Sequence, residues 1–82
     1  MSEGNDAVAQ EVLDIIASKL EKPIEALQQQ KTFVELGADS LDQADLLMDI
    51  EEKFNVSIPE EESAEIKTIG DAIRCVRMHV GE

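Results

Sequence analysis

The sequence predicts an all-α fold of three main helices and one short helix, with a long loop between the first and second helices. Three segments carry apolar residues at helical spacing, and no segment shows the alternation of a half-buried strand. Two residue pairs, Asp39 with Asp42 and Thr68 with Asp71, have the spacing of helix capping boxes. At 82 residues, the chain is expected to form one domain over residues 1–82.

The first helix is predicted from about Asp6 to Leu20, with Asn5 or Asp6 as its N-cap. Its apolar positions are Val8, Val12, Ile15, Ile16 and Leu20. The next 19 residues, Glu21 to Asp39, show no sustained period and are expected to form a loop. This loop is much longer than the usual connection of about 4–6 residues. We expect this loop to pack against the helices through its apolar residues, which are Ile24, Leu27, Phe33, Val34 and Leu36.

The second helix is predicted over Ser40 to Phe54, capped by Asp39. A helical wheel places its expected core residues on one side: Leu46, Leu47, Ile50 and Phe54, with Gln43 near their centre. A short third helix should open at Pro59 and end near Ile66. The last helix should begin at Thr68 and stop at Gly81. Its apolar stripe consists of Ile69, Ala72, Ile73, Val76 and Val80.

The composition is strongly acidic, with 19 Asp and Glu against 7 Lys and Arg, for a net charge of −12. This charge argues against an autonomous nucleic-acid binder, because phosphate contacts require clustered Lys and Arg, and against docking on an anionic membrane. The sequence contains no run of 18 or more apolar residues, so no membrane span is predicted. The polar start of the chain does not resemble a secretory signal, so we expect a cytoplasmic protein, or a plastid or mitochondrial one after removal of a presequence.

The charge is concentrated between Asp39 and Glu62, where nine acidic residues accompany one lysine and hold −8 of the −12. The outward side of the second helix mixes apolar and acidic residues: Leu41, Asp45, Met48 and Glu52, flanked by Ala44, Asp49 and Glu51. A small apolar patch among carboxylates is typical of a docking surface for a basic partner, because charge steers the encounter. A merely solvated acidic face is the alternative interpretation.

Ser40 stands where the loop containing Gly37 meets the second helix. A serine at this position is most often a cap or a first-turn residue. The other interpretation is an attachment point, since a phosphate on its hydroxyl would face helix N–H groups and the positive end of the helix dipole. A self-sufficient nucleophile is not expected, because it needs a positioned base. The only histidine, His79, lies near the far end of the chain and is expected at the surface.

No dedicated metal site is predicted from the sequence. Asp39, Asp42 and Asp45 do not follow the spacing of a calcium loop, because Leu41 and Gln43 interrupt it. The single cysteine, Cys75, cannot form an internal disulfide or a multi-cysteine metal site. We expect it to be a half-buried structural thiol at the edge of the last helix's apolar stripe.

The segment Leu36-Gly37-Ala38-Asp39-Ser40-Leu41-Asp42 resembles the prosthetic-group signature of acyl carrier proteins. The similarity extends over residues 12–20, 33–35, 46–54, 58–59 and 66–73, which is nearly the whole chain. The resemblance implies a small four-helix bundle that is not an enzyme. Its serine, matched by Ser40, would carry covalent 4′-phosphopantetheine, on which acyl chains travel as thioesters.

The resemblance also implies partners, namely a phosphopantetheinyl transferase and acyl-transfer and fatty-acid synthesis enzymes with basic docking patches. The matching partner-binding positions are Asp39, Leu41, Ala44, Asp45, Met48, Asp49 and Glu52. Ala44 replaces a usual larger aliphatic residue and Asp49 a usual small one, so the patch is more acidic than is common. A monomeric carrier of fatty-acid biosynthesis is the first expectation. The alternatives are a carrier for polyketide, aminoacyl or D-alanyl transfer, or an unmodified acidic helical interaction module.

Overall fold

The computed structural model describes the backbone of residues 3–80 and the side chains of residues 7–80. Its helices are α1 (Glu3–Leu20), the 3₁₀ helix η1 (Ile24–Ala26), α2 (Ser40–Phe54), α3 (Glu60–Ala64) and α4 (Ile69–His79). Within these residues the only β-type pairing is an isolated antiparallel bridge between Thr32 and Thr68. The predicted all-α fold of three main helices and one short helix is therefore confirmed.

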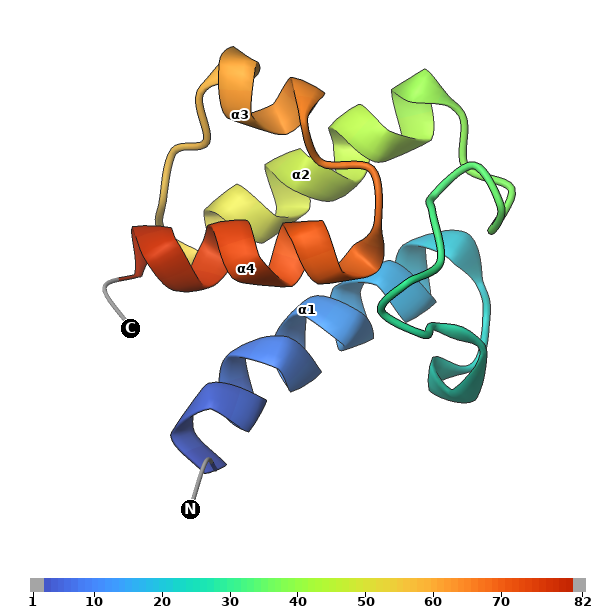
Figure 1. Ribbon diagram of the computed structural model, residues 1–82, viewed down its shortest axis with the longest axis horizontal. Helices are drawn as coiled ribbons and strands as arrows, with labels where there is room; N and C mark the ends of the chain where they lie inside the picture. Colours follow the sequence, from blue (N-terminus) through green and yellow to red (C-terminus); the bar gives the residue numbers. More distant parts are fainter. Residues whose placement is uncertain (1–2, 81–82) are drawn as a thin grey trace.

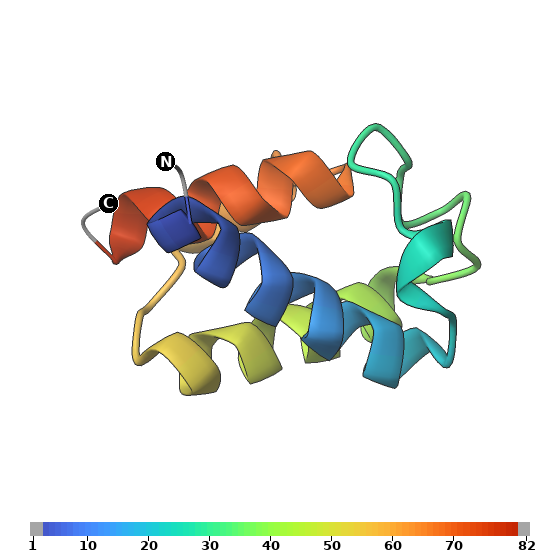
Figure 2. The same ribbon diagram turned by 90° about the horizontal axis from the view of Figure 1, so that it is seen from below.

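The three main helices form one bundle. α2 and α4 run in the same direction, and α1 crosses them in the opposite direction and packs against both (Figures 1 and 2). The long α1–α2 loop lies at the end of the bundle where α2 and α4 begin (Figure 1). The core consists of Val12, Ile16, Leu27, Phe33, Leu36, Ala38, Leu46, Ile50, Ile58, Ile66, Ile69, Ala72, Ile73 and Val76.

α1 begins earlier than the sequence predicted. It starts at Glu3, so Asn5 and Asp6 lie inside the helix and neither is its N-cap. The predicted apolar face is correct, since Val12 and Ile16 are fully buried. The helix ends at Leu20, and Glu21 then takes a left-handed conformation with φ 57°.

The long loop packs against the helices, as predicted, through Leu27, Phe33 and Leu36. The expectation is wrong for Ile24 and Val34, which are 37% and 78% exposed. The reason for Val34 is a tight turn, in which the N–H groups of Leu36 and Gly37 donate to the carbonyls of Phe33 and Val34. This turn directs Phe33 into the core and leaves its neighbour in solvent.

Both predicted capping boxes are present. Asp39 caps α2 together with Asp42, and Thr68 caps α4 together with Asp71, so that α4 itself begins at Ile69. α2 ends at Phe54 as predicted. α3 stops at Ala64 instead of reaching Ile66, because Ile66 is buried in the linker to α4. The predicted stop at Gly81 lies outside the described residues.

Candidate attachment site and docking face

Ser40 is the first residue of α2, and its side chain is exposed. Asp39 Oδ1 accepts a hydrogen bond from the Asp42 N–H at 2.9 Å, and Asp42 Oδ2 accepts one from the Asp39 N–H at 3.3 Å. Across residues 7–80, no side chain or backbone group holds the Ser40 hydroxyl by a hydrogen bond. The hydroxyl is therefore held on a well-capped helix end and is free to be modified.

The loop before Ser40 is anchored on both sides of a glycine. Leu36 and Ala38 are buried, and Gly37 between them has φ +88°, a conformation that favours glycine. A Cβ atom at Gly37 would meet nothing within 4 Å, so the space beside this glycine is open. A phosphodiester on Ser40 would lie at a helix start, where the first N–H groups have no intrahelical partners and the dipole favours negative charge. The residues present therefore fit a phosphate-linked group at Ser40.

The residues of the predicted docking face lie at the surface. All seven partner-binding candidates are exposed: Asp39, Leu41, Ala44, Asp45, Met48, Asp49 and Glu52. The apolar members Leu41 and Met48 are 76% and 57% exposed, while Leu46 and Ile50 on the opposite side of α2 are buried. One rigid helix therefore presents Ser40 and this acidic and apolar face together.

Two lysine contacts, which the sequence did not predict, restrain the edge of this face. Lys19 Nζ of α1 lies 3.0 Å from Asp49 Oδ2, and Lys53 Nζ lies 3.9 Å from Glu11 Oε1. The hydrogen bond with Asp49 raises the pKa of Lys19, and the charges of Asp45 and Asp42 act in the same direction. Part of the charge of Asp49 is thus offset by a lysine of the same chain. The sequence shows a lysine next to Ser18 near the end of the first helix, but it does not show which helix this lysine contacts.

His79 is a partly exposed residue of the last helix, and it has a partner that the sequence did not predict. It is half-buried at the end of α4, where its Nε2 lies 2.6 Å from Glu62 Oε1 of α3. α4 ends at the opposite end of the bundle from the start of α2 (Figure 1). The only imidazole of the chain is therefore remote from Ser40 and cannot activate it as a base.

Comparison with known proteins identifies the family of the chain. Residues 10–76 match the family model described as "Phosphopantetheine attachment site". The chain is 41% identical over 71 residues to an acyl carrier protein of Wolinella succinogenes, covering 85% of this chain and 93% of the relative. It is 43% identical over 67 residues to an acyl carrier protein of Porphyromonas gingivalis, covering 80% of this chain and 86% of the relative. The crystal structure of an acyl carrier protein from Thermotoga maritima superposes with a TM-score of 0.80 at 31% identity, covering 94% of this chain and 91% of that one.

The chain therefore belongs to the acyl carrier protein family, as the sequence resemblance indicated. Proteins of this family are carriers and not enzymes, and their cofactor is covalently attached 4′-phosphopantetheine. When bound, this group supplies a terminal thiol that holds an acyl chain as a thioester. Among residues 3–80, no helix is long and apolar enough to cross a membrane.

Proposed function

We propose that Ser40 is the residue that carries 4′-phosphopantetheine. The observation that supports this assignment most directly is its position: an exposed serine at the first residue of α2, next to the capping Asp39, within the residues matched by the attachment-site family. The helix start stabilises the phosphodiester, and the open space beside Gly37 admits a modifying enzyme.

The chain then acts as a single-domain monomeric carrier, residues 1–82, in fatty-acid biosynthesis in the cytoplasm. The similarity to bacterial proteins named acyl carrier protein supports this proposal. The family favours a carrier over an unmodified interaction module. A carrier for a dedicated route, such as polyketide, aminoacyl or D-alanyl transfer, is the alternative within the class. Identification of the thioester on protein purified from its native host distinguishes these pathways.

Intact-mass analysis tests the attachment site. After incubation with coenzyme A and a phosphopantetheinyl transferase, the wild-type chain should gain the mass of one phosphopantetheine. Ser40→Ala should gain none, and the matched control Ser57→Ala, which removes another exposed serine, should be modified like the wild type. Modification of Ser40→Ala, or no modification of a folded wild-type chain, would refute the assignment.

The docking face is proposed to bind basic patches on the transferase and on acyl-transfer and synthesis enzymes. Its acids, Asp45 and Glu52 among them, steer the encounter, while Leu41 and Met48 supply apolar contact. Glu52→Lys should lower kcat/KM for the transferase about tenfold at low salt, and the difference should shrink as salt is added. Glu25→Lys makes the same charge change on η1, away from this face, and should have a much smaller effect. Equal effects of the two variants would contradict a specific docking role.

A further inference from the structure

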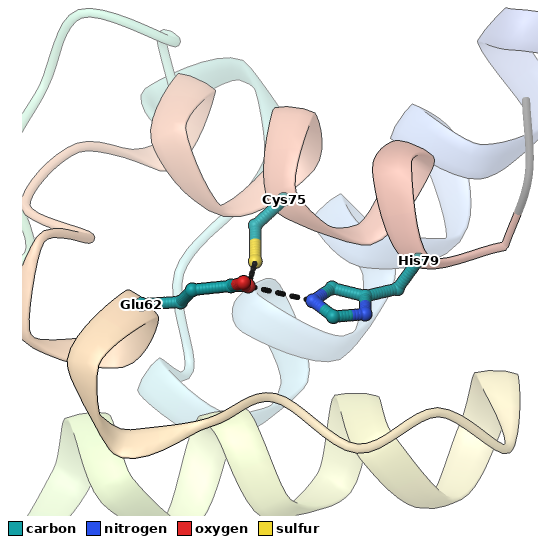
Figure 3. Close-up of side chains that lie close together, drawn as sticks. All are labelled: Glu62, Cys75 and His79. Carbon is teal, nitrogen blue, oxygen red and sulfur yellow. Dashed lines mark hydrogen bonds and ion pairs between the residues drawn. The ribbon is translucent and has the colours of Figure 1, made fainter.

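Three metal-binding side chains that the carrier function does not use meet on the far side of the bundle. Glu62 comes from α3, and Cys75 and His79 come from α4 (Figure 3). Cys75 and His79 are four residues apart, so they lie on the same face of α4. The Cys75 thiol donates to Glu62 Oε1 at 3.5 Å, and His79 Nε2 lies 2.6 Å from the same oxygen. The three donor atoms all lie within 4.8 Å of one another.

The donor set is that of a zinc site. Thiolate sulfur, imidazole nitrogen and carboxylate oxygen are the ligands that Zn²⁺ takes in proteins, with four-coordinate tetrahedral geometry. With typical zinc–ligand bond lengths, a tetrahedral ion holds its donor atoms roughly 3.4–3.6 Å apart. The Cys75–Glu62 separation of 3.5 Å already matches this value. The Glu62–His79 separation of 2.6 Å has to open by about 1 Å, and the Cys75–His79 separation, which lies within 4.8 Å, has to settle in the same range.

The surroundings favour a cation. A pocket beside the cluster is lined by Glu65 and Asp71 as well as by Glu62, with Arg74 as its one basic residue among the described ones. Burial raises the pKa of the Cys75 thiol to about 11, and the neighbouring Glu62 acts in the same direction. The hydrogen bond with His79 lowers the pKa of Glu62. Among the described residues, the pocket at the cluster thus presents three carboxylates and one guanidinium.

We propose that Glu62, Cys75 and His79 bind one Zn²⁺ ion per chain and that this ion joins α3 to α4. On binding, the S–H bond of Cys75 is replaced by a sulfur–zinc bond, and one proton leaves to solvent. The proton that His79 Nε2 donates to Glu62 Oε1 moves through solvent to Nδ1, so that the neutral imidazole binds the ion through Nε2. A water molecule from the neighbouring pocket takes the fourth position. The site departs from the sequence prediction of no metal site, because its ligands come from two helices that only the fold brings together.

The ion would stabilise the short helix α3. α3 has five residues and no side-chain cap, so little within the helix itself holds it in place. A bond from Glu62 through zinc to two residues of α4 replaces a pair of hydrogen bonds by a rigid link. Because the cluster uses none of the residues of the proposed attachment site or docking face, the inference is independent of the proposed function.

Cobalt and zinc titrations of the full 82-residue chain test the proposal. Ser40→Ala is the background, so that no prosthetic thiol competes for the metal. Cys75 is the only cysteine of the sequence, so a thiolate-to-cobalt charge-transfer band with one Co²⁺ per chain must come from it. Zn²⁺ binding to the metal-free chain should release one proton and raise the melting temperature, and Zn²⁺ added to the cobalt-loaded chain should displace the cobalt without releasing a further proton.

Three ligand variants and one matched control give the test its specificity. Cys75→Ser, His79→Gln and Glu62→Gln should each lower zinc affinity by more than the roughly 10–100-fold typical of losing an outer-shell partner. Glu61→Gln makes the same charge change on the neighbouring residue of α3 and should bind zinc like the background. Equal binding by all variants would assign the metal to the acidic face. One ion per two chains would assign it to a dimer, and no charge-transfer band on folded protein would leave only the hydrogen-bonded cluster; each result overturns the proposal.

Discussion

Gln43 Nε2 donates a hydrogen bond of 2.7 Å to the carbonyl oxygen of Ile66, joining α2 to the linker before α4. The two residues are 23 positions apart in the sequence. Gln43 sits on the core side of α2, where the helical wheel left a polar residue among apolar ones. The bond explains this placement, because the amide satisfies a carbonyl that α3 and α4 leave unpaired between them. It also holds the linker against the helix that carries Ser40.

Removing this bond should destabilise the fold. We expect Gln43→Ala to lower the free energy of unfolding by about 1–3 kcal/mol, since a partly buried carbonyl would lose its partner. Urea denaturation followed by circular dichroism measures the change. Gln30→Ala, at an exposed glutamine of the loop, should stay within about 0.5 kcal/mol of the wild type. If the two variants were equally stable, the Gln43 bond would contribute nothing.

Packing of the long loop depends on one aromatic residue. Phe33 is 1% exposed, and its N–H donates to the carbonyl of Lys67 at 3.1 Å. Phe33→Ala should cost about 3–5 kcal/mol through the cavity it leaves. A chain of this size has a total stability of roughly 4–12 kcal/mol, so the variant should unfold at a much lower urea concentration than the wild type. Val34→Ala, at its exposed neighbour, is the control and should unfold like the wild type.

The Asp71 carboxylate should make stability depend on pH. Its pKa is lowered below 3.8, chiefly by hydrogen bonds from the N–H groups of Lys67 and Thr68. A carboxylate with a depressed native pKa stabilises the fold above the pKa of the unfolded state. This contribution is lost as the pH falls through the lower native pKa.

The test compares the wild type with Asp71→Asn by urea denaturation in a pH series. The wild type should be more stable at neutral pH, and the difference should shrink once the pH falls below about 3.8 and approaches the native pKa. Glu65→Gln, at an exposed acid of the preceding turn, should show no such convergence. A difference that stayed constant across the series would mean that the charge of Asp71 is not responsible.

Repulsion along α2 and α3 should make the protein sensitive to salt. The segment from Asp39 to Glu62 carries −8 with Lys53 already counted, and the contact of Lys19 with Asp49 offsets only part of this charge. NaCl and, more strongly, MgCl₂ at equal ionic strength should raise the melting temperature. Asp45→Asn should weaken the response more than Glu25→Gln does. A flat response in the wild type would show that the cluster costs little stability.

Much of the candidate site could be predicted because it depends on local sequence. The Asp39–Asp42 box set the start of α2, and the helical period placed Leu41 and Met48 outward and Leu46 and Ile50 inward. The start of α1 could not be predicted equally well, because the cap was sought at Asn5 and Asp6 and the helix begins before them. The burial of Phe33 and the exposure of Val34 depend on a turn that apolar content alone does not reveal.

The order of the helices, the capping boxes of α2 and α4, the charged face and the serine at its end could be predicted from the sequence, because they follow from neighbours within one or two helical turns. The contacts between elements depend on the three-dimensional fold: Lys19 with Asp49, Gln43 with the carbonyl of Ile66, and Glu62 with Cys75 and His79. Such contacts depend on the angles at which helices pack and on the path of the loops. A pattern along one helix carries no information about either.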